Sequence, residues 1–180
     1  MSKGGITVRN RFVLITNNLS LHRSVVNGRP ADADLYPDVL LQFTPFSPSR
    51  FIEGSSLDVL IAVRDAVHLG GRLLTHPLCG NLRPHQQPFR SVLIEERIIE
   101  EKISGIPKKL DEPRGFPPVG SLPLVDLESL SMIEEAVLVY RGCQNRLLLP
   151  ERLSDEVRKD YAFIDGELMK ESLLQYRILS

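Results

Sequence analysis

Cys79 and His76 lie three residues apart in a stretch, residues 66–94, that contains no acidic side chain. The same stretch holds three arginines and three histidines, so its local field is positive. A positive field or a nearby imidazolium lowers the pKa of a thiol, and the pair therefore predicts a nucleophilic cysteine with a histidine base. The alternative is that Cys79 packs as a small apolar residue while His76 hydrogen-bonds the turn at Pro77. No third group that would orient the histidine is apparent, so both interpretations stay open.

Arg83 and Arg90 flank a proline-containing run in the same loop. Pro84 and Pro88 favour an extended chain, from which a guanidinium group can bind a carboxylate or a phosphate. The alternative is that both arginines pair with the acidic residues of segment 95–101, which begins just beyond the loop. The loop is therefore a candidate anion-binding site.

Polar residues also follow two apolar runs at the points where strands are expected to end. Thr16, Asn17 and Asn18 follow the first run, and Thr75 and His76 follow the other. Parallel strands would bring both sets to one edge of a sheet, where they could line a pocket together. Asparagines also favour ordinary turns without any ligand. The full set of predicted ligand-binding residues is Thr16, Asn17, Asn18, Thr75, His76, Asn81, Arg83 and Arg90.

The sequence predicts neither a metal nor a cofactor. His22 and His68 are too far apart in sequence to suggest a metal site, and His68 is better placed to interact with the dipole at the end of a helix. Gly70 and Gly71 end a helix rather than beginning one, and no GxGxxG or GxxxxGKS motif is present. Dinucleotide and P-loop binding are therefore disfavoured.

The elements that must position these residues follow from hydrophobic spacing and from turn residues. Leu57 to His68 has helical spacing after the capping residue Ser55, and Asp126 is placed to cap another helix that ends near Gly142. Residues 19–37 are ambiguous, and residues 95–102 fit either a strand or a helix. The predicted strands are 12–16, 38–43, 72–75 and 91–94, followed by a proline-rich excursion at 104–123 and a C-terminal helical segment at 154–176.

The last helical segment carries an apolar stripe that can pack within the domain or against a second copy, so a homodimer is possible. The stripe consists of Val157, Tyr161, Ile164, Leu168 and Leu174. The order of the elements predicts one α/β domain over residues 1–180, with a mainly parallel sheet of about four strands flanked by helices. This is a Rossmann-like layering without a dinucleotide motif.

Composition narrows the classes of function. A net charge of -1 gives no basic face for nucleic acid, and no run approaches the roughly 20 apolar residues of a membrane span. The apolar segment near the start of the sequence is too short for a signal peptide. We therefore expect a cytoplasmic protein. Cys79 and Cys143 are expected to be free thiols in that compartment.

Three segments, residues 12–18, 73–94 and 126–129, resemble the GrdX family, small proteins encoded beside glycine, sarcosine or betaine reductase components. The most specific part is the run from His76 to Gly80. The resemblance implies an accessory or ligand-sensing role, with amino-acid reductase components as possible partners. Cys79 stands where the family is expected to have a small hydroxyl residue, which counts against an essential thiol.

The leading hypothesis is an accessory protein that binds an anionic small molecule or a partner protein through residues 75–91 without turnover. One alternative is an enzyme for acyl or thiol transfer that uses Cys79 and His76. Another is a structural interaction module of a larger complex.

Overall fold

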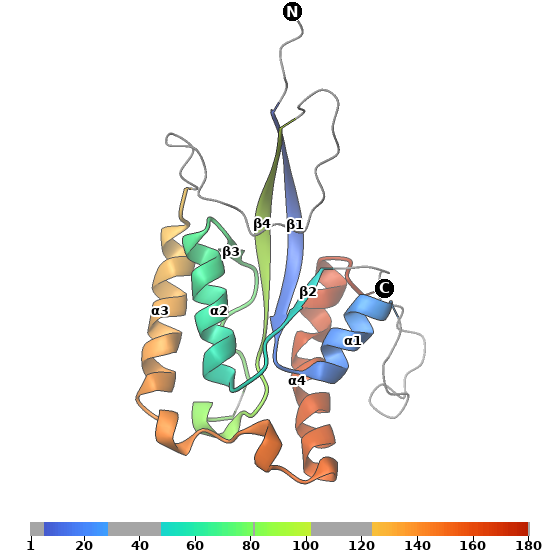
Figure 1. The fold of residues 1–180 in the computed structure, drawn as a ribbon, viewed down its shortest axis with the longest axis vertical. Coiled ribbons are helices and arrows are strands. Elements are labelled where there is room, and N and C mark those ends of the chain that lie inside the picture. The colour runs from blue at the N-terminus through green and yellow to red at the C-terminus, as the bar shows by residue number, and fades with distance from the viewer. Residues whose placement is uncertain (1–5, 29–47, 81, 102–123, 180) are drawn as a thin grey trace, which may run out of the picture.

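The computed structural model describes residues 6–28, 48–80, 82–101 and 124–179. The described residues form four strands, four α-helices and three short 3-10 turns (Figure 1). In order they are β1 (Ile6–Thr16), α1 (Leu19–Asn27), β2 (Ser49–Phe51), α2 (Ser56–His68), β3 (Arg72–Leu73), η1 (Pro84–Gln86), β4 (Ser91–Glu101), α3 (Leu127–Arg141), η2 (Gln144–Arg146), η3 (Pro150–Arg152) and α4 (Asp155–Gln175).

The sheet has four strands in the order β2-β1-β4-β3. β1 pairs with β2 in parallel, but β4 runs antiparallel to both β1 and β3. The prediction of an α/β fold is confirmed, and the prediction of a mainly parallel sheet is wrong. The reason lies in the loop between β3 and β4, which turns the chain back on itself instead of crossing over through a helix.

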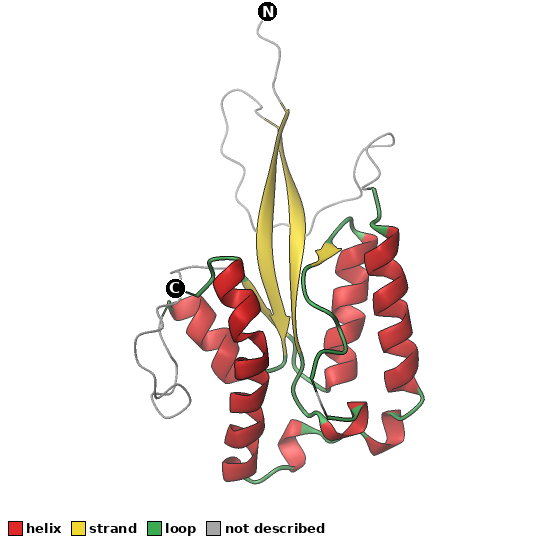
Figure 2. Ribbon diagram, turned by 180° about the vertical axis from the view of Figure 1, so that it is seen from behind, coloured by secondary structure: helices red, strands yellow, loops and turns green. Residues whose placement is uncertain are grey.

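Helices cover both faces of the sheet. Val13 and Ile15 of β1 face α2 and α3, while Leu14 between them faces α1 and α4. This alternation follows from the period of two in a strand, and it produces two buried apolar clusters on opposite sides of one sheet. Beyond the helices, β1 and β4 continue as a two-stranded ribbon (Figures 1 and 2).

The helix predictions depend on local capping, and the structure agrees with them. Ser55 and Asp58 form a capping box at the start of α2, and the Asp126 side chain accepts a hydrogen bond from the Ser129 backbone at the start of α3. α4 corresponds to the predicted C-terminal helix. None of the described helices is long and apolar enough to cross a membrane.

Several boundaries differ from the sequence predictions. The ambiguous residues 19–37 contain α1, residues 95–101 continue β4, and the predicted strand 72–75 ends at Leu73. β2 was not predicted, because three residues carry no usable periodicity. The predicted strand 38–43 and the proline-rich excursion 104–123 lie outside the described residues.

The apolar stripe predicted for α4 is not its buried face. Ile164, Leu168 and Leu174 are 43%, 42% and 40% exposed. A second stripe runs along this helix and packs on the sheet. It has the small residue Gly166 at its centre. The buried face of α4 consists of Ala162, Asp165, Gly166, Met169 and Leu173.

Candidate ligand-binding pocket

The carboxyl ends of β1 and β3 point to the same edge of the sheet, because both strands are antiparallel to β4. Thr16 at the end of β1 pairs with Ser91 at the start of β4. Thr75, two residues after β3, accepts a hydrogen bond at Oγ1 from the Leu93 backbone at 3.0 Å. The polar residues singled out after the two apolar runs therefore do lie at one edge, although the sheet is mixed.

Asn17 fastens the loop before β4 to the end of β1. Its Nδ2 donates to the carbonyls of Gly54 and Pro88, at 3.0 and 2.9 Å, and its Oδ1 accepts from the Arg90 backbone at 2.8 Å. The side chain is 4% exposed, and these contacts use all its polar atoms. Asn17 thus fixes the position of Arg90.

Asn18 connects α4 to the same edge. Its Nδ2 donates to the Ala162 carbonyl at 2.9 Å and to Oδ2 of Asp165 at 3.0 Å, while its Oδ1 caps α1. The Ser91 hydroxyl donates to the same Asp165 oxygen at 2.6 Å and lies 2.7 Å from the Thr16 hydroxyl. A buried carboxyl group on a helix is therefore held by Ser91 at the start of β4 and by Asn18, the residue that caps α1.

Arg90 is 3% exposed and is held from two sides. One terminal nitrogen, NH1, donates to the Cys79 carbonyl at 2.7 Å, and the other, NH2, donates to the Tyr140 hydroxyl at 2.6 Å. The third nitrogen, Nε, is buried without a hydrogen-bond partner, and no ion pair joins this guanidinium to Asp165 in the described part of the chain. A buried donor without a partner is uncommon and calls for an explanation.

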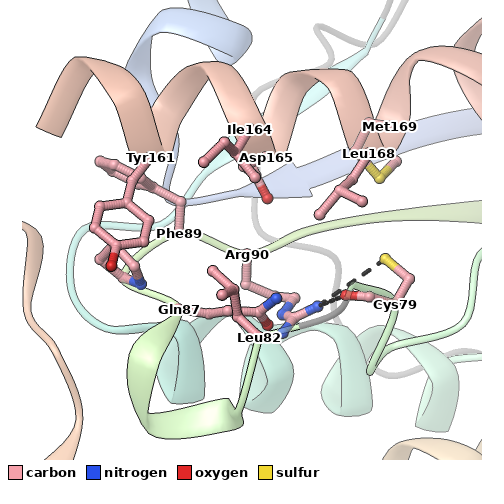
Figure 3. A pocket seen from close by; sticks show the side chains of 11 residues that line it. Cys79, Leu82, Gln87, Phe89, Arg90, Tyr161, Ile164, Asp165, Leu168 and Met169 are labelled. Carbon is pink, nitrogen blue, oxygen red and sulfur yellow. Dashed lines mark hydrogen bonds between the residues drawn. The ribbon is translucent and has the colours of Figure 1, made fainter. Parts of the chain in front are cut away.

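Arg90 and Asp165 both line a pocket between α4 and the loop that precedes β4 (Figure 3). The pocket is narrow as it stands: the space open to the centre of a water molecule is about 10 Å³, roughly enough for one water. Its walls are formed by Cys79, Leu82, Gln87, Pro88, Phe89 and Arg90 from the loop and by Tyr161, Ile164, Asp165, Leu168 and Met169 from α4.

Burial dominates the electrostatics of the pocket. It raises the pKa of Asp165, with the hydrogen bonds from Ser91 and Asn18 and the charge of Arg90 acting in the opposite direction. Burial also raises the pKa of Tyr140, which Arg90 offsets in part. Arg90 and Asp165 thus face the same pocket, and burial favours the neutral form of the acid.

The structure does not support an activated thiol at Cys79. Burial raises its pKa, and the Arg90 charge, with NH1 4.0 Å from Sγ, offsets this only in part. His76 is exposed, and its Nδ1 accepts from the Leu78 backbone at 3.1 Å. No hydrogen bond joins the His76 and Cys79 side chains, both of which are described.

The two arginines of the loop differ in position. Arg83 is exposed and does not line the pocket, whereas Arg90 is buried in its wall. Neither pairs with Glu95 or Glu96, the nearest acidic residues expected as partners. Those carboxylates instead pair with Arg72 at 3.0 Å and with Arg11 and Arg50 at 2.7 and 2.9 Å. Asn81 lies outside the described residues.

Sequence reasoning missed Asp165 and Tyr140. Asp165 does leave a signal, since it is an acidic residue between Ala162 and Met169 on one face of a helix. Tyr140 leaves none, because an aromatic residue at helical spacing is ordinary core. Within the described ranges, no three or more histidine, cysteine or acidic residues come together in a way that could hold a metal ion.

The fold and the pocket define a three-layer α/β protein with a mixed four-stranded sheet and a buried arginine at its edge. Comparison with protein families gives a match to the GrdX-like proteins over residues 37–106, which supports assigning the chain to the GrdX family. The match contains segment 73–94, on which the resemblance chiefly depends, and so includes the loop wall of the pocket; α4 lies outside it. No curated protein and no solved structure gave a significant match.

Proposed function

We propose that this GrdX-like protein binds a small anion in the pocket beside Arg90 and does not turn it over. The observation that carries the proposal is the buried guanidinium whose Nε has no partner. Burying a charged group without full hydrogen bonding is costly, and an anionic oxygen at the Nε–H would supply the missing bond. Binding without turnover is consistent with the raised pKa of Cys79, which disfavours a thiolate nucleophile.

The pocket residues divide between binding and support. Arg90 would contact the anion, and Tyr140 and the Cys79 carbonyl would hold its guanidinium in orientation. Thr16, Asn17 and Asn18 would act indirectly, because the hydrogen bonds of their side chains go to other protein groups. Of the loop residues predicted to bind the ligand, Arg90 is the one that the proposed site requires.

A thermal-shift screen of carboxylates and phosphates against the full chain tests the proposal. A ligand at about 100 times its Kd stabilises by about 2.7 kcal/mol, which for a chain of this length raises Tm by about 5–10 °C. Arg90→Lys keeps the charge but removes the Nε–H fork, and it should weaken binding at least tenfold. Arg83→Lys makes the same change at an exposed position of the same loop and should bind as the wild type does.

Two outcomes would refute the proposal. One is a screen in which no anion stabilises the wild type. The other is an Arg90→Lys protein that folds normally and binds with unchanged affinity.

A cytoplasmic location and contact with amino-acid reductase components also remain predictions. The free thiols Cys79 and Cys143 support the predicted location.

A further inference from the structure

We infer that the ligand of this pocket is a short aliphatic monocarboxylate, whose carboxylate meets Arg90 and whose carbon chain lies along α4. The inference rests on the proposed function and specifies its ligand. It depends on two features of the pocket that anion binding alone does not explain: the number of its charges and the apolar side chains at its mouth.

The charges of the lining residues favour a ligand with one negative charge. Arg90 is the one cation among the residues of the pocket wall, and Asp165 is the one acid. A monoanion is balanced by the guanidinium, whereas a second negative charge would have no cation to offset it and would lie beside a carboxyl group. Dianions such as phosphate esters are therefore disfavoured.

The apolar side chains form the mouth. Leu82, Ile164 and Leu168 are 39%, 43% and 42% exposed, and all three line the pocket around the buried arginine (Figure 3). Three large aliphatic side chains grouped at an opening match a ligand whose far end is apolar. An inorganic anion would leave these surfaces in water.

Nε is buried, so a ligand can reach that atom only if side chains of the pocket wall move. Leu82 and Leu168 are suited to such a movement, since they are partly exposed and not locked in the core. Side-chain rotamer changes of this kind are common on binding. The aliphatic chain of the ligand would then cover the displaced leucines.

Calorimetric titration of the full chain with acetate, butyrate, hexanoate and inorganic phosphate tests the inference. Each added methylene should tighten Kd about two- to fourfold, and phosphate should bind more weakly than butyrate. Leu168→Ser should reduce the tightening of Kd per added methylene. Leu174→Ser is the matched control, because Leu174 is on the same helix and 40% exposed but does not line the pocket.

The outcomes separate this inference from the proposed function. If no anion binds, the proposed function fails and the inference with it. If acetate and phosphate bind as tightly as hexanoate, or if Leu168→Ser folds and keeps the chain-length dependence, the inference alone fails. Tighter binding of 2-aminobutyrate than of butyrate would also overturn it, since it would show that Asp165 pairs with an ammonium group.

Discussion

Asp165 places a carboxyl group between α4 and the start of β4, where the residue is 8% exposed. Its Oδ2 accepts from Asn18 and Ser91, yet burial outweighs these hydrogen bonds and raises its pKa above the ordinary value of 3.8. A raised carboxyl pKa means that the folded protein binds this proton more tightly than the unfolded chain does. The contribution of Asp165 to stability is therefore complete below pH 3.8 and is lost as the pH rises through its folded pKa.

The substitution Asp165→Asn tests this direction. An amide cannot ionise, so the unfolding free energy of the variant relative to the wild type should increase as the pH rises from about 4, and then level off above the folded pKa. Urea unfolding between pH 4 and pH 8 measures the difference. Asp160→Asn, an exposed change on the same helix, is the control. A difference that does not vary with pH for Asp165→Asn would contradict the prediction.

The thiol of Cys79 should behave as a half-buried, unactivated thiol rather than as a nucleophile. Because burial raises its pKa, its alkylation by iodoacetamide should reach half its maximal rate at a higher pH in the folded protein than in urea. Arg90→Met removes the charge that partly offsets burial and should shift this midpoint further upward. A folded midpoint below the unfolded one would instead favour the hypothesis of a thiol enzyme.

At the scale of elements, α4 is attached to the sheet edge through Asn18. This residue caps α1, and its Nδ2 also bonds the Ala162 carbonyl and the Asp165 carboxyl group of α4. Asn18→Ala should therefore cost about 2–3 kcal/mol, from a lost cap of about 1 kcal/mol and from buried groups left without partners. Chemical denaturation measures the loss. Asn27→Ala, at the exposed end of α1, should change stability by less than about 0.5 kcal/mol.

The sequence predicts elements well where the signal is local. Ser55 and Asp126 are capping residues whose effect does not depend on the rest of the fold, and both helices begin where these residues predict. It fails for the orientation of α4, because Ile164 and Leu168 form as apolar a stripe as Ala162 and Met169. Only packing against β1 and β4 decides between the two faces.

The residues of the candidate site likewise divide into those with a local sequence signal and those without one. The cluster of polar residues after β1 is visible in the sequence, as is the positive loop that contains Arg90. The hydrogen bonds from Asn18 and Ser91 to Asp165 are not visible in the sequence, because they join residues 147 and 74 positions apart along the chain. Long-range hydrogen bonds leave no periodic pattern, so a buried acid on a helix face is the most that sequence alone can show.

For the whole molecule, strand direction is the feature that the sequence could not settle. The connection from β3 to β4 covers residues 74–90, and a loop of this length can return antiparallel or cross over the sheet. Contacts of the folded loop fix the outcome, among them the Ser56 hydroxyl bonding the Gln87 carbonyl and Asn17 bonding Pro88. The same loop forms one wall of the pocket. The contacts that set the antiparallel direction of β4 therefore also position the candidate site.

The prediction of a single domain can be tested through cooperativity. Ile133 belongs to the apolar cluster under α2 and α3, and Met169 belongs to the one under α1 and α4; they are 0% and 1% exposed. Because β1 and β4 contribute to both clusters, neither layer should unfold alone. Ile133→Ala and Met169→Ala should each lower stability by about 2–5 kcal/mol and still give one transition, with circular dichroism and tyrosine fluorescence coinciding. Two separate transitions in either variant would show that the two sides of the sheet are independent units, and that the pocket between α4 and the loop could open without unfolding the rest.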